Sequence, residues 1–285
     1  MADSPLRRKP RLEEAAAAPP DLLTSLPLEV LDKILCRLHI YDVVRTAALS
    51  RAWRRRWESL PTVDLTRSRG LVAEDVDALL LRRTAPIRTF RLGAYDDSWY
   101  VDALHDWILH LSRNGVQNLF LWFPPIKFRL HSSLFSCGSL TCLNLTSCRL
   151  PPTPLGFAGF PSLKILLLDK VAISEHGGRE FAALIGVSPL IEEMKLVRVE
   201  LIGENSEDDI EHLPLLRSAG LNGCNYAKFL MGMRQVTKLE FATASNWLTE
   251  VDVLDRLPFL FENLRNLAIS VDFRNGPYFI FVLPT

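Results

Sequence analysis

One pattern of apolar residues recurs along the chain beyond residue 85, and it constrains the fold more than any other feature. Its fullest copy places apolar or small residues at Leu140, Leu143, Leu145, Cys148 and Leu150. Good copies follow from Leu163 and from Ile191. Looser copies start at Ile87, Val116, Leu216, Val236 and Leu264. Eight copies at intervals of roughly 20 to 29 residues indicate a solenoid built from one repeated unit.

The spacing within each copy has a physical reason. Two apolar residues separated by one position, such as Leu143 and Leu145, lie on the same face of a short strand. One repeat cannot cover them alone, but stacked repeats bury them together, at about 1.5 to 3 kcal/mol for each side chain. The small residue near the end of the unit, such as Cys148 or Cys224, is expected to turn the chain inward and to bond turn amides. The pattern therefore predicts a parallel sheet with one strand from each repeat.

A second kind of periodicity occupies residues 22 to 61, where apolar residues recur at helical spacing. Pro27 suits a first helical position, and the spacing predicts one apolar face made of Leu28, Leu31, Ile34, Leu35 and Leu38. A second helix is expected from Asp42 to Leu49. A third, capped by Ser50, would carry Trp53 and Trp57 on one side. The segment thus predicts three short helices.

This helical segment strongly resembles the F-box. The resemblance is carried by the sequences LPLEVLDKILCRL and DVVRTAALSRAWRRRW, which have the order and spacing of that family over nearly the whole segment. Together with the repeats, the chain is similar to the plant family of F-box/FBD/leucine-rich-repeat proteins. The resemblance implies an α/β fold: a three-helix F-box over 22–62, then a leucine-rich-repeat domain over 63–285 with a parallel sheet on its concave face.

The resemblance also implies a function. F-box proteins of this kind are non-catalytic substrate-recognition subunits of SCF-type cullin ubiquitin ligases, in which the F-box docks a Skp-type adaptor that leads to the cullin scaffold. Carried over by position, the residues expected to contact the adaptor or to support that contact are Leu26, Pro27, Ile34, Leu35, Leu38, Val44, Leu49, Trp53 and Trp57. The alternative is that these side chains only bury one another. A module of about 40 residues has too little interior for that.

Residues between the buried positions of each repeat are expected to form a surface that binds a target protein. The residues expected there are Arg91, Phe120, Trp122, Asn144, Ile165, Leu167, Asp169 and Lys195. Phe120 and Trp122, with Ile165 and Leu167 two repeats later, would form an apolar patch of the kind that marks an interface. The alternative is that Phe120 and Trp122 are covered by the F-box or by a loop. Both interpretations stay open from the sequence.

Charge does not identify a partner, because 33 Lys and Arg residues balance 33 Asp and Glu residues. We therefore expect neither nucleic acid nor a membrane surface as a partner. The arginine cluster at Arg51, Arg54, Arg55 and Arg56 is interpreted as a solvated helix face, with phosphate binding as the alternative. The basic run from Arg7 to Arg11 resembles a nuclear-localisation patch, so the expected location is nucleus, cytoplasm or both.

No catalytic or metal-binding motif accompanies these features. The six histidines have no cysteine partners at zinc spacing, and no phosphate-binding loop or nucleophile motif is present, so no cofactor or metal is expected. The five cysteines are interpreted as reduced thiols. Two alternatives to a substrate receptor remain: an interaction protein that binds the adaptor without presenting a target, and an enzyme whose active site lies in the loops.

The two ends of the chain carry further expectations. Residues 1–20 contain almost no large apolar side chains and are expected to be disordered. After Leu264 the sequence LAISVDFRNGPYFIFVLPT resembles the start of another repeat. A solenoid normally ends in a polar cap. The sequence therefore predicts a repeat domain of about eight irregular units whose C-terminal cap is missing, in a chain truncated before the FBD region.

Overall fold

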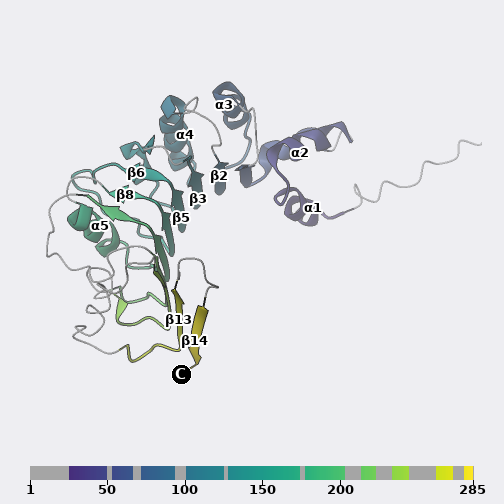
Figure 1. The fold of residues 1–285 in the computed structure, drawn as a ribbon. Coiled ribbons are helices and arrows are strands. Elements are labelled where there is room, and N and C mark those ends of the chain that lie inside the picture. Colours follow the sequence, from purple (N-terminus) through teal and green to yellow (C-terminus); the bar gives the residue numbers. More distant parts are fainter. Residues whose placement is uncertain are drawn as a thin grey trace, which may run out of the picture.

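The structure is a computed structural model that describes residues 26–49, 53–66, 72–93, 101–124, 128–173, 177–202, 213–222, 233–243, 261–271 and 279–284. A long sheet runs through the molecule, with helices α1 and α2 at one end and strands β13 and β14 at the other (Figure 1). The predicted disordered tail, residues 1–20, lies outside the described residues.

Short helices form the N-terminal segment. They are α1 (Leu28–Leu35), α2 (Ile40–Arg45), and the 3-10 helices η1 (Thr46–Ala48) and η2 (Arg56–Ser59). The first two predicted helices are present, although α2 begins at Ile40, two residues before the predicted Asp42. The predicted third helix is wrong in form, because Trp53 lies in a turn and Trp57 in η2. The proposed cap, Ser50, is outside the described residues.

The packing of α1 corrects the expected apolar face. Leu31 and Leu35 are buried and Leu38 is half-buried, whereas Leu28 and Ile34 are exposed. Residues four apart on a helix share a side, so Leu31 and Leu35 fill the core together. They join Ile40, Val43, Trp53 and Trp57 in the buried interior of this segment.

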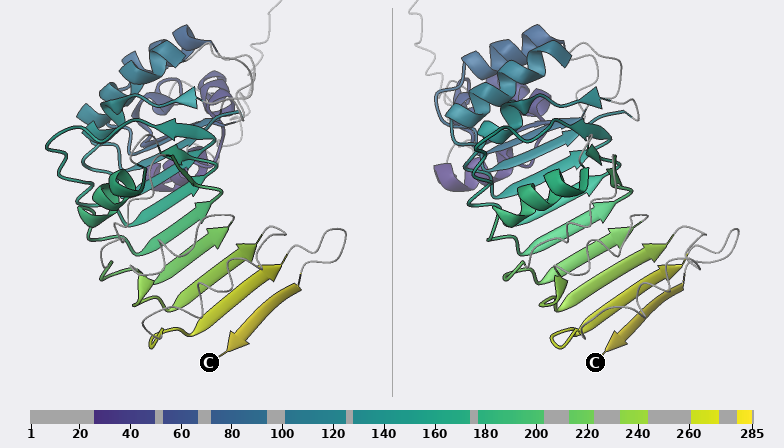
Figure 2. Two further views of the ribbon diagram at one scale, coloured as in Figure 1. Left: turned by 60° about the vertical axis from the view of Figure 1, so that its left-hand side comes forward. Right: turned by 90° about the vertical axis from the view of Figure 1, so that its left-hand side faces the viewer.

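Within the described residues, one ten-stranded sheet contains the strands of all eight predicted repeats (Figure 2). These strands are β2 (Thr89–Gly93), β3 (Asn118–Trp122), β5 (Cys142–Thr146), β7 (Ile165–Asp169), β9 (Glu193–Val197), β11 (Ser218–Asn222), β12 (Lys238–Thr243) and β13 (Asn266–Val271). A further strand, β1 (Thr62–Leu65), precedes them. The strands from β1 to β13 pair in parallel with their neighbours, as the repeat pattern predicts.

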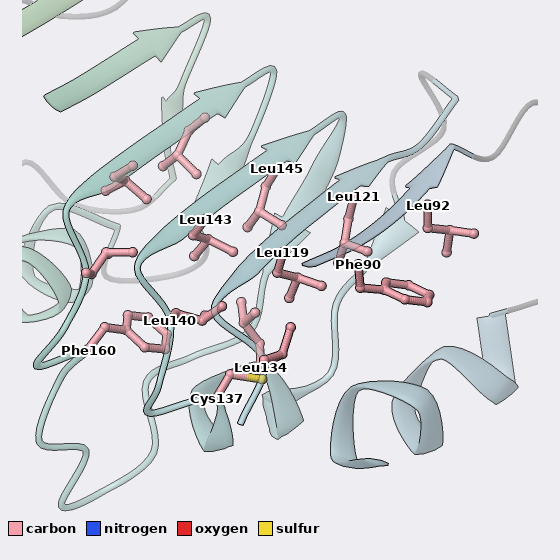
Figure 3. Close-up of a cluster of buried hydrophobic side chains, with 14 of the residues drawn as sticks. Phe90, Leu92, Leu119, Leu121, Leu134, Cys137, Leu140, Leu143, Leu145 and Phe160 are labelled. Atoms are coloured by element: carbon pink, nitrogen blue, oxygen red, sulfur yellow. The ribbon is translucent and has the colours of Figure 1, made fainter. Parts of the chain in front are cut away.

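The strands align without offset, so equivalent residues of successive repeats form straight rows. Leu119, Leu143 and Leu166 are register partners on β3, β5 and β7, and all three are buried. The next inward row runs through Leu121, Leu145 and Leu168. Figure 3 shows inward side chains of β2, β3 and β5 above the segment that carries Leu134 and Cys137. The two inward apolar residues of successive strands thus build one continuous core.

Helices cover the same face of the sheet that the buried rows occupy. They are α3 (Ala73–Leu81), α4 (Val101–Arg113), η3 (Ser132–Ser136) and α5 (Gly177–Gly186). A second, four-stranded sheet has the order β10 (Glu200–Leu201), β8 (Ala172–Ile173), β6 (Cys148–Leu150) and β4 (Phe128–Arg129). Among the described residues, no helix covers the opposite face of the long sheet from β3 to β13, which Figure 1 shows nearly edge-on.

The turn after each central strand is made one residue earlier than the sequence predicts. Ser147, Lys170 and Arg198 each directly follow a strand and have φ values of 57°, 53° and 49°. Their amides donate to a carbonyl of the next strand in the sheet; Ser147 N–H, for example, bonds the Asp169 oxygen at 2.8 Å. Cys148 lies in β6, where its side chain is buried. Cys224 is outside the described residues.

The C-terminal segment does not begin another repeat of the same kind. Strand β14 (Phe279–Pro284) runs antiparallel to β13, with Ile269 opposite Phe281. A hairpin partner needs no crossover, whereas a further repeat would have added a parallel strand.

Among the helices of the described residues, none combines the length and the apolar character needed to cross a membrane.

Candidate binding surfaces

The helical segment leaves an unusual number of large apolar side chains in contact with solvent. Fourteen large hydrophobic residues are exposed in the described part of the chain, and six of them lie between residues 28 and 49. These six are Leu28, Val30, Ile34, Tyr41, Val44 and Leu49. They come from α1, α2 and the residue after η1. Such a concentration of exposed apolar residues is typical of a protein interaction site.

The predicted adaptor-contact residues divide into two groups in the structure. Pro27, Ile34, Val44 and Leu49 are exposed, with Leu49 at 61% and Ile34 at 43%. Leu35, Trp53 and Trp57 are buried, and Leu26 and Leu38 are half-buried. The first group can touch a partner directly, whereas the buried residues can only support that surface.

Three exposed members of this surface are missing from the predicted contacts: Leu28, Val30 and Tyr41. Val30 and Ile34 are four residues apart and share a side of α1. Helical spacing predicts that Leu28 is buried together with Leu31 and Leu35. This prediction is wrong for Leu28, which is exposed. The sequence signal that could have found Val30 is its pairing with Ile34.

Polar contacts hold the exposed helices against the rest of the protein. Arg56 of η2 donates two hydrogen bonds to the Asp32 carboxylate of α1, at 2.7 and 2.6 Å. The predicted solvated face is therefore wrong for Arg56, whose side chain is 22% exposed and ties two elements together. Farther along, Arg83 donates to the backbone oxygen of Trp57. These links fix the position of the exposed apolar surface relative to the sheet.

The helix-free face of the sheet presents the residues that alternate with the buried rows. Its middle row contains Asp64, Arg91, Phe120, Asn144, Leu167, Lys195, Gly220 and Glu240 as successive register partners. Arg91 is 3.5 Å from Asp64 and lies 4.8 Å from the centre of the Phe120 ring. The row therefore begins with an ion pair stacked on an aromatic ring.

All eight predicted target-contact residues lie on outward positions of neighbouring strands. Five of them are in the middle row just described: Arg91, Phe120, Asn144, Leu167 and Lys195. Trp122 and Asp169 belong to a parallel row through Thr146, and Ile165 to the row through Cys142. Arg91, Trp122 and Lys195 are exposed, and the other five are half-buried. The structure thus brings the eight residues onto one face.

The four residues of the predicted apolar patch lie on this face, but strand β5 separates Phe120 and Trp122 from Ile165 and Leu167. Asn144 is the register partner of both Phe120 and Leu167, so it separates them in the middle row. Trp122 is 41% exposed and Phe120 is half-buried. Among the described residues, Arg91 lies over the Phe120 ring, and neither ring is fully buried.

Beyond β7 the same face becomes charged. Lys238 pairs with Glu240 at 2.7 Å, and this hydrogen bond raises the pKa of the lysine. Glu193 and Lys195 of β9 are both exposed. Cys142 occupies an outward position but is buried, and burial raises the pKa of its thiol to about 11. The face therefore offers an aromatic end and a charged end.

The described residues contain no group of three or more His, Cys, Asp and Glu side chains that could hold a metal ion. Cys36, Cys137, Cys142 and Cys148 are all free thiols. Burial raises the pKa of Cys137 and Cys148 to about 12, which removes the thiolate that a nucleophile needs.

Comparison with known protein families matches both parts of the chain. The F-box domain model matches residues 23–64, and the model for the leucine-rich repeats of FBD-associated F-box protein At5g56370 matches residues 104–204. The chain carries an F-box followed by leucine-rich repeats. The resemblance deduced from the sequence is thereby confirmed, together with the mixed α/β fold and its parallel sheet.

The chain is also similar to F-box proteins of Arabidopsis thaliana. F-box/FBD/LRR-repeat protein At1g13570 is 28% identical over 88% of this chain and 69% of its own length. FBD-associated F-box protein At4g13985 is 31% identical over 64% of this chain and 43% of its own. Putative F-box/FBD/LRR-repeat protein At1g66290 is 24% identical over 91% and 57%. The chain thus spans only part of the length of each of these relatives.

Proposed function

We propose that this chain is a non-catalytic substrate receptor of an SCF-type cullin ubiquitin ligase, acting in the nucleus, the cytoplasm or both. Its F-box docks a Skp-type adaptor and thereby the cullin scaffold, while the helix-free face of the repeat sheet holds a target protein. One observation carries the proposal: six exposed large apolar residues gather between residues 28 and 49, in a segment that matches the F-box.

An adaptor would remove this apolar surface from water. Each large side chain that passes from exposed to buried contributes on the order of 1.5 to 3 kcal/mol. Leu28, Ile34 and Leu49 alone would supply several times the thermal energy once covered. The buried Trp53 and Trp57 hold the helices in place without needing to touch the adaptor themselves.

The repeat face would supply specificity and no chemistry. It combines the Phe120 and Trp122 rings with the charged residues Glu193 and Lys195. Aromatic rings are frequent anchors of protein interfaces, and surrounding charges select among partners. A receptor of this kind accelerates ubiquitin transfer by raising the local concentration of the target near the charged conjugating enzyme. No catalytic residue of its own is required.

The adaptor contact is tested with charged substitutions on the exposed helices. The double variant Ile34→Asp and Val44→Asp places two carboxylates where the adaptor would have to desolvate them. Co-expression with a Skp-type adaptor should yield a complex with the unmodified chain and none with this variant. Leu215→Asp is the matched control, because Leu215 is equally exposed, at 41% against 43% and 41%, but lies in the repeats. Retention of the adaptor by the double variant would refute the proposal.

Target presentation needs a second experiment. Affinity purification under proteasome inhibition compares the unmodified chain with the Ile34→Asp, Val44→Asp variant. Proteins captured equally by both are bound through the repeats, and a reconstituted ligase should attach ubiquitin to them only when this chain is present. A chain that binds the adaptor but supports no such modification would be the non-productive interaction protein. Ubiquitin transfer from the charged conjugating enzyme in the absence of the cullin scaffold would instead indicate an enzyme.

A further inference from the structure

A basic pocket lies where the F-box meets the first repeats. It has a volume of about 420 Å³, and charged residues from two segments line it: Arg54, Arg55 and Glu58 from the F-box, and Arg82 and Arg83 from the end of α3. The remaining lining residues are Leu81 and Thr84. The arginine cluster recognised in the F-box sequence is thus only half of a larger basic group, which the fold completes with the two arginines after α3.

The charges of the lining residues do not balance. Four guanidinium groups face one carboxylate, an excess of three positive charges. Glu58 is 3% exposed and accepts from Arg55 at 2.9 Å, with Arg82 at 3.8 Å. Arg82 also stacks over the Trp57 ring, 5.4 Å from its centre. The single carboxylate is therefore already engaged by two arginines.

Arg83 has hydrogen-bonding capacity that the protein leaves unused. Its Nη1 donates to the backbone oxygen of Trp57, while Nε and Nη2 are buried and have no hydrogen-bond partner in the described residues. Burial lowers the pKa of Arg83 to about 10, an effect that Cys36 and Glu58 partly oppose. A buried guanidinium with two unpaired donors is costly unless something else accepts from them.

We infer that this pocket binds a phosphate-bearing anion. Phosphate oxygens match the planar fork of a guanidinium, and Nε with one terminal nitrogen is a donor pair that bonds two of them at once. Arg83 lines the pocket and carries such an unpaired donor pair, and Arg54 and Arg82 add charge at its exposed edge. The volume is larger than one phosphate group needs, so the pocket admits a ligand with two phosphates or with a phosphate on a larger body.

A site made from both segments has a structural consequence. The Glu58 backbone oxygen accepts from the Thr84 amide at 2.9 Å, and Pro61 accepts from the amides of Arg88 and Thr89, so backbone bonds already join the two segments. An anion held by Arg54 on one side and Arg83 on the other would add a charged contact across the same junction. Ligand binding should therefore stabilise the folded chain.

The test measures binding of pyrophosphate to the full chain by calorimetry and by thermal unfolding, against chloride at the same ionic strength. Pyrophosphate should bind and raise the melting temperature, whereas chloride should do neither. Arg83→Gln should weaken pyrophosphate binding about tenfold or more, because it removes the buried donor pair. Arg54→Gln should weaken it by a smaller factor. Arg113→Gln is the matched control, since Arg113 is exposed at the end of α4 and does not line the pocket.

Each outcome decides the inference. If Arg83→Gln unfolds the chain, the exposed Arg54→Gln variant carries the test, because it perturbs no buried contact of the described residues. Equal losses in the Arg54 and Arg113 variants, or no difference between pyrophosphate and chloride, would overturn the proposal. The last measurement adds a phosphoserine peptide as a competing ligand. Binding of the peptide that competes with pyrophosphate indicates protein-borne phosphate as the source, and pyrophosphate binding alone indicates a free polyphosphate.

Discussion

The F-box and the repeat sheet treat apolar side chains in opposite ways. Each central strand of the sheet buries two of them completely, such as Leu143 and Leu145, and turns mixed residues such as Asn144 outward. The helices of the F-box bury about half of theirs and leave Leu28, Ile34 and others in water. Stacked repeats supply their own cover, whereas a segment as short as the F-box cannot.

The difference indicates two kinds of recognition in one chain. A surface of exposed apolar side chains on helices suits a partner that is always the same, since affinity comes from area removed from water. The outward residues of the sheet can be substituted with little loss of stability, because they contribute little to the core.

The largest effect is expected for the buried row of the sheet. Leu145→Ala should lower the free energy of unfolding by about 2 to 5 kcal/mol, because Leu145 is fully buried and neighbouring strands cannot close the cavity. Asn144→Ala, one residue earlier and facing outward, should change it by less than about 0.5 kcal/mol. Urea unfolding followed by circular dichroism measures both. Similar losses in the two variants would mean that the outward row is structural as well.

A large effect on target capture, but not on folding, is expected for the aromatic end of the outward face. Replacing Phe120 and Trp122 with Ser should weaken capture of repeat-bound proteins at least about tenfold, because aromatic anchors dominate interfaces. Adaptor binding should persist. Leu190→Ser is the control, since Leu190 is comparably exposed at 38% but lies outside the strands. Loss of adaptor binding or of soluble protein would instead assign the two rings to a structural cap.

A smaller effect on stability is expected for the ion pair that fixes the exposed helices. Arg56→Gln removes the two hydrogen bonds to Asp32 and should cost about 1 kcal/mol, a modest value because both side chains are partly exposed to solvent. Arg45→Gln, exposed on α2, is the control. Melting curves of the purified variants provide the measurement. If the free energy of adaptor binding fell by more than the free energy of unfolding, the ion pair would mainly orient the F-box surface.

The repeat sheet was predictable because each strand is marked by apolar residues that lie close together in the sequence. All eight copies identified from leucine spacing carry strands in the same sheet, since two apolar residues per strand leave the chain few other ways to bury them. Strand β1 was missed although Leu60, Val63 and Leu65 are buried at similar spacing. These three residues directly follow the helical segment. Their strand spacing could therefore not be distinguished from the helical spacing before it.

The binding surfaces were less predictable for a physical reason. Leu31 and Val30 are similar side chains one residue apart, yet one is buried and the other exposed, because burial depends on what packs against the helix. The basic pocket depends on Arg54 and Arg83, which the fold brings together from distant positions. The antiparallel direction of β14 was likewise not indicated by the apolar run. Contacts between segments were thus the part that sequence patterns could not supply.

The smallest effect is expected in thiol chemistry, where the two regions should again differ. Cys36 of the F-box is half-buried, whereas burial raises the pKa of Cys142 to about 11 and of Cys137 and Cys148 to about 12. At pH 8 only about one in a thousand Cys142 thiols is ionised, and fewer of the other two. Among the four described cysteines, iodoacetamide should therefore label the more accessible Cys36 first. Mass spectrometry of the native protein after brief labelling gives the order.

Raising the pH should reduce the difference in labelling rate between Cys36 and the buried cysteines, and it should do so in a defined order. At pH 10 about a tenth of Cys142 thiols are ionised, so Cys142 should label before Cys137 and Cys148. The raised values also mean that the folded state holds thiol protons which the unfolded chain loses above the ordinary pKa of 9.0, so stability should fall as the pH rises past that value. Fast labelling of Cys137 at pH 8 would show that the repeat core opens locally, contrary to the continuous packing of its leucine rows.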